Sequence, residues 1–149
     1  MGVRAIPDGY RSVTPGLIVR GAAQAIDFYV EAFDATELTR LPMGDKIGHA
    51  EIRIGDCVVM LADEFPDMNL LAPTPGGASS VTLMIYVEDV DKAFAQAVQA
   101  GATAERPVQD EFYGDRAGTL LDPFGHRWTL STHVEDVDEA EIKRRMASM

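Results

Sequence analysis

The 149-residue sequence predicts an α+β fold made of two tandem copies of one strand–helix–three-strand (βαβββ) module, followed by a C-terminal helix. Three observations support this fold class. A short apolar strand is followed by an amphipathic helical stretch twice along the chain. The two copies align residue by residue, with Val19 corresponding to Val87 and Ala32 to Ala100. Turn residues then divide the chain after each helix into three short strands.

The first module is predicted to span residues 12–64. Its helix is indicated by apolar residues at helical spacing, namely Ala22, Ala25, Ile26, Tyr29 and Phe33. One of its later strands alternates, because Ala50, Ile52 and Ile54 are apolar while the residues between them are polar. The expected elements are a strand at 12–19, a helix at 22–33, and strands at 36–42, 46–54 and 57–63.

The second module is predicted to span residues 81–133, after a Pro/Gly-rich linker at 65–80. Gly101 is expected to end its helix. The tail at 134–149 is expected to form a helix capped by Asp136, with Glu139 as its capping-box partner. The whole chain, 1–149, is predicted to be one domain. The expected elements of the second module are a strand at 81–87, a helix at 90–100, and strands at 103–112, 115–121 and 126–133.

The composition limits the classes of partner. The formal net charge is −11, from 24 acidic and 13 basic residues, which argues against nucleic acid and permits a cationic ligand. No apolar run is long enough for a membrane span, so no membrane association is expected. Cys57 is the only cysteine, and the N-terminus does not read as a secretory signal. A cytoplasmic location is therefore expected.

Two motifs resemble one known superfamily. The stretch Ala25-Ile26-Asp27-Phe28-Tyr29 and the run Asp122-Pro123-Phe124-Gly125-His126-Arg127-Trp128 are similar to those of the vicinal-oxygen-chelate superfamily, which includes glyoxalases, extradiol dioxygenases and bleomycin-resistance proteins. Residues 113–116, Tyr-Gly-Asp-Arg, resemble the PhnB-like branch. The resemblance implies that the two modules form a curled mixed sheet around a groove. It also implies a homodimer, in which modules are sometimes exchanged between chains.

The resemblance further implies four metal-ligand positions, one on the first and one on the last strand of each module. Carried over by spacing, they fall on Thr14, Thr82, Thr129 and either Val59 or, after a one-residue slip, Met60. None of these is a histidine or a carboxylate, and hydroxyl or apolar side chains are poor ligands for divalent ions. The sequence therefore predicts that the usual metal site is absent, with no metal and no other cofactor.

Strand alternation indicates which side chains share the groove with those positions. His49 and Glu51 point the same way and are the best remaining pair for a displaced metal or for acid–base chemistry, although a solvated polar pair is favoured. Arg116 is placed in the groove by the repeat, either as a clamp for an anion or in an ion pair with Glu51 or Asp115. Trp128 has the opposite alternation and is predicted to be core. The predicted ligand-binding residues are Thr14, His49, Glu51, Met60, Thr82, Met84, Tyr86, Tyr113, Arg116 and Thr129.

Three functions remain open from the sequence. The favoured one is a non-catalytic protein of the antibiotic-sequestration type, which binds a small cationic or aromatic molecule in the groove. The second is a metal-dependent lyase, isomerase or dioxygenase with a displaced site at His49 and Glu51. The third is a metal-free enzyme that transfers protons through His49, Glu51 or Arg116. The fold alone does not choose among them, because this fold hosts all of these activities.

Overall fold

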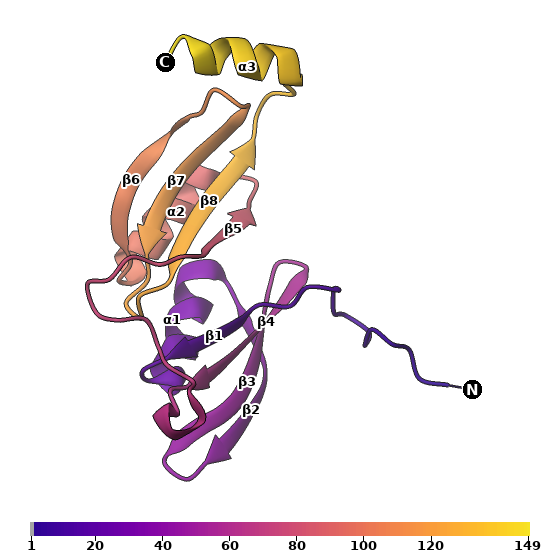
Figure 1. Ribbon diagram of the computed structural model, residues 1–149, viewed down its shortest axis with the longest axis vertical. Helices are drawn as coiled ribbons and strands as arrows, with labels where there is room; N and C mark the ends of the chain where they lie inside the picture. Colours follow the sequence, from indigo (N-terminus) through magenta and orange to yellow (C-terminus); the bar gives the residue numbers. More distant parts are fainter. Residues whose placement is uncertain (1) are drawn as a thin grey trace. The chain divides into compact units, whose positions relative to one another are not determined.

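The computed structural model describes residues 2–149 and divides into two compact units, of which the first ends at Ala78 and the second begins at Ser79. Each unit is a four-stranded sheet with a helix packed on one face (Figure 1). The first unit has strand order β1-β4-β3-β2, with β1 parallel to β4 and the other pairs antiparallel. Its elements are β1 (Gly16–Val19), α1 (Ala22–Phe33), β2 (Thr36–Met43), β3 (Lys46–Ile54) and β4 (Cys57–Asp63).

The second unit repeats this topology. Its strand order is β5-β8-β7-β6, with β5 parallel to β8 and the remaining pairs antiparallel. The predicted α+β fold with two βαβββ modules is therefore confirmed. Its elements are β5 (Thr82–Tyr86), α2 (Val90–Ala100), β6 (Thr103–Asp110), β7 (Asp115–Leu121), β8 (Arg127–His133) and the tail helix α3 (Glu139–Ala147).

Each core lies between the helix and one face of its sheet. In the first unit the apolar stripe of α1 is buried against alternate strand residues, which include Val19, Ile52 and Leu61. The opposite side of that sheet, which carries His49, Glu51 and Met60, is called the first open face below. In the second unit Leu120, Trp128 and Leu130 lie on the α2 side. The side that carries Thr82, Met84, Tyr86, Asp115 and Thr129 is called the second open face.

A side chain near the end of the last strand holds the first turn of each helix. Asp63 is 9% exposed, and its Oδ1 accepts hydrogen bonds from the backbone N–H groups of Gly21 at 3.0 Å and Ala22 at 2.8 Å. Its Oδ2 accepts from the N–H of Ile47 at 2.7 Å. In the second unit the hydroxyl of Thr132 accepts from the N–H of Val90 at 3.0 Å. In each unit, a helix N–H group that has no partner within the helix is thus bonded to the last strand of the sheet.

The run 122–128 is a structural turn motif in this chain. Asp122 Oδ1 accepts from the backbone N–H groups of Phe124 at 2.8 Å and His126 at 3.0 Å, which shapes the turn between β7 and β8. Its Oδ2 accepts from the indole Nε1 of Trp128 at 2.8 Å. Trp128 is 2% exposed, so the prediction that it belongs to the core is confirmed. A buried indole N–H needs a partner, and the turn supplies it.

The largest differences from the predicted elements fall at three places, while β2, β5, β6 and β8 begin or end within one or two residues of their predicted bounds. The first strand begins only at Gly16, because Pro15 has no N–H to give to a sheet. The tail helix begins at Glu139 and is capped by Asp138, whose side chain accepts from the N–H of Glu141, so the prediction that Asp136 caps it is wrong. The first part of the expected linker is folded, with the 3₁₀ turn η1 (Pro66–Met68) and a bridge between Phe65 and Leu70.

Within residues 2–149, none of the helices is both long enough and apolar enough to cross a bilayer.

Replacing Asp63 should destabilise the first unit. Burial on its own would raise the pKa of Asp63, but the three backbone N–H bonds outweigh it and the pKa lies below the usual 3.8. The stabilisation is therefore fully present above pH 3.8 and is lost as the pH falls through the lower folded-state pKa. Asp63→Ala should lower the free energy of unfolding at pH 7 by about 2–3 kcal/mol in urea denaturation. The exposed Asp45→Asn is the control, and an equal loss in both variants would contradict this account.

Asp122 and Trp128 should be energetically coupled. Asp122→Ala leaves two turn N–H groups and a buried indole N–H without their acceptor, and should cost about 2–3 kcal/mol of stability. Trp128→Phe removes only one of these bonds and some packing. Because both variants break the same indole bond, the double variant should be less destabilised than the two single losses added together. Additive losses in a urea double-mutant cycle would show that the indole bond contributes nothing.

Candidate functional site

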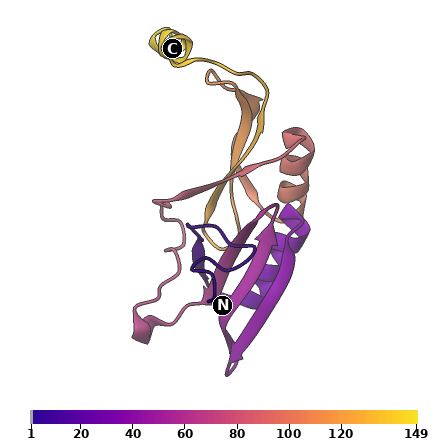
Figure 2. The ribbon, with the colours of Figure 1, turned by 90° about the vertical axis from the view of Figure 1, so that its right-hand side faces the viewer.

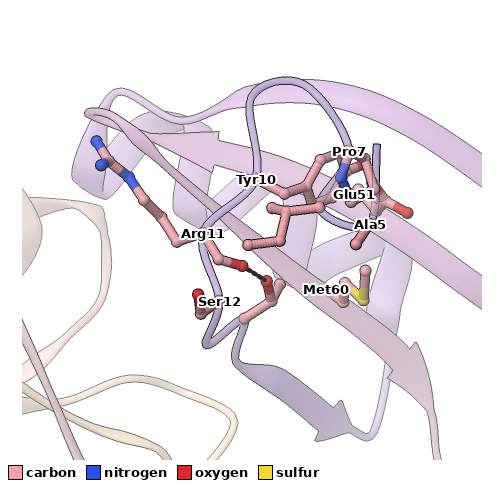
Figure 3. Close-up of a pocket in the computed structure, with 9 residues that line it drawn as sticks. Ala5, Pro7, Tyr10, Arg11, Ser12, Glu51 and Met60 are labelled. Atoms are coloured by element: carbon pink, nitrogen blue, oxygen red, sulfur yellow. Dashed lines mark hydrogen bonds between the residues drawn. The ribbon is translucent and has the colours of Figure 1, made fainter. Parts of the chain in front are cut away.

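The first open face carries a pocket of about 410 Å³ (Figure 3). Its floor comes from β3 and β4, and its wall comes from the N-terminal segment, which lies on the side of the sheet opposite α1 (Figure 2). Three of the predicted ligand-binding residues, Thr14, Glu51 and Met60, are brought together here. The residues that line the pocket are Ala5, Ile6, Pro7, Tyr10, Arg11, Ser12, Thr14, Glu51 and Met60.

Glu51 is the only carboxylate in this lining, and both of its oxygens have partners. The hydroxyl of Tyr10 donates to Oε1, and Nε2 of His49 lies 2.7 Å from Oε2. The Tyr10 hydrogen bond, and then the His49 bond, hold the pKa of Glu51 below its usual value. The same bond to Glu51 raises the pKa of the Tyr10 phenol. Glu51 is therefore ionised at neutral pH and held in one orientation.

Met60, and not Val59, is the residue of β4 that reaches the first open face. Met60 lies opposite Glu51 on β3 and opposite Gly16 on β1, whereas Val59 is buried opposite Ile52. Gly16 has open space where a side chain would stand, with no neighbouring atom within 4 Å of an added Cβ. Arg11, the one cation in the lining, pairs with Asp56 at 2.7 Å, and its guanidinium points away from Glu51 in Figure 3.

The second open face brings together four more of the predicted residues. Thr82, Met84 and Tyr86 alternate along β5, and Thr129 lies opposite Met84 on β8. The hydroxyls of Thr119 and Thr129 are 3.0 Å apart and share a hydrogen bond. This face is therefore hydroxyl-rich at its centre, with an exposed methionine and an exposed tyrosine along β5.

Beside the threonines lies a tyrosine–carboxylate–histidine cluster. Asp115 is 4% exposed, and its Oδ2 accepts from the hydroxyl of Tyr86 at 2.8 Å. Its Oδ1 lies 2.8 Å from Nδ1 of His133, whose Nε2 lies 2.7 Å from Asp136. Asp136, and then Asp115, raise the pKa of His133 above its usual 6.5. The bond to Asp115 likewise raises the pKa of the Tyr86 phenol.

Two predicted site residues lie elsewhere. Arg116 is on the α2 side of its sheet, where it pairs with Asp91 at 2.9 Å and Asp110 at 3.1 Å, so its placement in the groove and its expected partners are wrong. The alignment of the two modules is wrong by one residue on β7, and an error of one residue exchanges the two faces of a strand. Tyr113 lies in the turn before β7, with its ring edge-on to Phe112.

The residues at the expected metal positions do not fit a divalent ion. They are threonine hydroxyls and the thioether of Met60. The two possible ligands beside them, His49 and Glu51, are hydrogen-bonded to each other. Across residues 2–149, no three histidine, cysteine, aspartate or glutamate side chains are grouped so that they could hold a metal ion. Two protein ligands are too few for a tight site.

Three residues of these hydrogen-bonded clusters were not among the ligand-binding residues predicted from the sequence. Tyr10 precedes the first module and carries no periodicity that would place it over the sheet. Asp115 looked like a turn residue in Tyr113-Gly114-Asp115, and its pairing with Tyr86 depends on the register of two strands far apart in the chain. His133 has the right alternation for the second open face, but nothing local indicates its two carboxylate partners.

Comparison with known proteins bears on the chain as a whole. The protein Mb0911c of Mycobacterium bovis is 45% identical over 141 residues, which cover 92% of this chain and 93% of that protein. The crystal structure of TioX from Micromonospora sp. ML1 matches with a TM-score of 0.67 and 27% identity, covering 83% of this chain and 99% of TioX. The PhnB protein of Bacillus cereus matches with a TM-score of 0.64 at 17% identity, covering 82% and 99%, and this likeness concerns the fold alone.

The family assignment rests on a family model that matches most of the chain. The family model described as the Glyoxalase/Bleomycin resistance protein/Dioxygenase superfamily matches residues 11–130, which include both βαβββ modules almost to their ends. The resemblance inferred from the motifs at 25–29 and 122–128 is thereby confirmed. The chain belongs to the glyoxalase/bleomycin resistance protein/dioxygenase superfamily.

Proposed function

We propose that this protein binds a small organic cation with apolar surface on the first open face, without a metal ion. The observation that carries the proposal is the state of Glu51. It is a carboxylate kept ionised by Tyr10 and His49 within a pocket whose other walls include Ala5, Ile6, Pro7 and Met60. Such pockets, mostly apolar with a few fixed polar groups, are typical of sites for small molecules.

Charge supports a cation as the ligand. A negative side chain in a partly apolar pocket attracts a positive group more strongly than it would in open water. The net charge of −11 draws cations toward the protein as a whole. The thioether of Met60 adapts to apolar groups of different shapes. Together these features favour a basic nitrogen attached to an apolar or aromatic body, as the sequence led us to expect.

A second candidate function is favoured by one contact. His49 Nε2 and Glu51 Oε2 are 2.7 Å apart, which is the arrangement of a histidine base oriented by a carboxylate. This supports a metal-free proton-transfer enzyme as the alternative. The two functions differ in the fate of the ligand. A binding protein returns it unchanged after long incubation, whereas an enzyme converts it at a rate that His49→Gln abolishes, as mass spectrometry would show.

The charge of Glu51 should depend on Tyr10. Tyr10→Phe removes the main hydrogen bond to Oε1, so the pKa of Glu51 should rise toward its usual 4.5. The pKa is read from the pH titration of the carboxyl carbon by NMR in protein labelled at glutamate. Tyr113→Phe, in the other unit, is the matched control. If Glu51 titrates at the same pH in Tyr10→Phe as in the parent protein, the phenol does not set its charge.

Ligand binding should require Glu51. In a thermal-shift titration, benzamidine, which joins a cation to an aromatic ring, should raise the melting temperature, because a ligand of the native state stabilises it. Neutral benzamide should raise it less, and Glu51→Gln should reduce the benzamidine shift. Affinity should persist as the pH falls from 7 and weaken only below the usual glutamate pKa of 4.5, because the pKa of Glu51 is lowered.

Two outcomes would contradict the proposal. Asp45→Asn removes the same charge from an exposed turn, so an equal loss of the benzamidine shift in that variant would assign the effect to net charge alone. A divalent metal found at one equivalent per chain, in protein purified without chelator, would overturn the metal-free part of the proposal.

A further inference from the structure

The second open face contains a hydroxyl group that the fold itself leaves unused. Ser131 is 0% exposed, and its Oγ has no hydrogen-bond partner among residues 2–149. A buried hydroxyl without a partner costs stability, and most buried polar groups in proteins are paired. Ser131 lies on β8 opposite Tyr86 and Ala117, so its side chain shares the open face with Tyr86 and Thr129.

The Tyr86 side chain explains why Ser131 is buried. Tyr86 stands on the edge strand β5, and its hydroxyl reaches Asp115 on β7, two strands away, at 2.8 Å. To make this bond, its ring has to cross β8 at the level of Ser131. Ala117, the neighbour of Ser131 on β7, is covered as well, at 4% exposed. Tyr86 itself is 60% exposed, so its ring is a cover with solvent on its outer side.

Beneath and beside this ring lie two groups suited to one ligand. Asp115 offers Oδ2, which now accepts from the phenol, and Ser131 offers an unused hydroxyl on the neighbouring strand. The other oxygen of Asp115 is held by His133, which also contacts Asp136. The net charge of Asp115, His133 and Asp136 together is negative whether the imidazole is neutral or protonated, because two carboxylates face one histidine.

We propose that the second open face holds a separate cation subsite, in which an amidinium or guanidinium group replaces the Tyr86 hydroxyl on Asp115 and also hydrogen-bonds to Ser131. A planar cation of this kind carries several N–H donors in one plane, so it serves both acceptors at once. The displaced Tyr86 ring supplies an aromatic face against which the cation stacks. The phenol thus stands where a ligand's N–H group would stand.

This subsite is distinct from the one proposed at Glu51. Its residues belong to the other unit. They are also not the repeat equivalents of the Glu51 site, because the position of the second sheet that corresponds to Glu51 is Thr119, which lies opposite Thr129 as Glu51 lies opposite Met60. An experiment can therefore show that a ligand does not bind at this subsite independently of whether it binds at Glu51. Loss of one site leaves the other intact.

Amide NMR of the full chain with benzamidine as the probe tests this inference. Two groups of signals should shift in the titration, one around Glu51 and Met60 and one around Tyr86, Asp115 and Ser131. Glu51→Gln should abolish only the first group. Tyr86→Phe, which frees Asp115 from its phenol donor, should tighten binding at the second group several-fold.

Ser131→Ala is the decisive variant. Its hydroxyl has no partner in the free protein, so its removal should leave the melting temperature unchanged or raised. The same change should weaken benzamidine at the second group about tenfold, the loss expected for one hydrogen bond to a charged group. Ser148→Ala, which removes an exposed hydroxyl on the tail helix, should change neither. If signals around Tyr86 do not shift in the parent or in Tyr86→Phe, or if Ser131→Ala binds as the parent does, the subsite does not exist.

Discussion

The bond between the end of the last strand and the start of the helix is the constraint on which each unit depends. Asp63 joins the first turn of α1 to β4 and to β3 through three backbone N–H groups, and Thr132 joins α2 to β8 in the second unit. These contacts fix the helix on one side of the sheet. The other side remains free of helix, and every candidate binding group of the protein lies there or beside it.

Much of the fold could be predicted because it is encoded locally. Helical spacing places α1 and α2 at their observed bounds, and turn residues place both ends of β3, β4 and β7. The residues of the two open faces were harder to predict, because an error of one residue in the register assigns every side chain of a strand to the wrong face. An error of one residue in the alignment of β7 led to the wrong prediction that Arg116 lies on the open face. For the same reason Asp115, which does lie there, was not predicted as a site residue. His49 and Glu51 lie on the face that alternation predicts, whereas on β4 the spacing gave Val59 and reached Met60 only after a one-residue slip.

The two open faces carry similar clusters of side chains, built from residues at different positions of the repeat. Each has a carboxylate bonded by a tyrosine on one oxygen and a histidine on the other: Glu51 with Tyr10 and His49, and Asp115 with Tyr86 and His133. Glu51 and Asp115 are not equivalent positions of the repeat, and Tyr10 lies outside it. The repeat therefore accounts for the backbone but not for these clusters. Both clusters thus hold a carboxylate beside an aromatic hydroxyl, although different positions of the chain supply the residues.

Gly16 shows how readily the chemistry of such a face is exchanged. It stands opposite Met60 in the parallel pair of β1 and β4, with empty space in place of a side chain. A Cβ introduced there would have no neighbouring atom within 4 Å, and Met60 stands next to it on the neighbouring strand. In this sheet the chemistry of the open face therefore depends on a few side chains held in one strand register. Substitutions at Gly16 and Met60 would therefore set new side chains beside Glu51 on three adjacent strands, with the strand register unchanged.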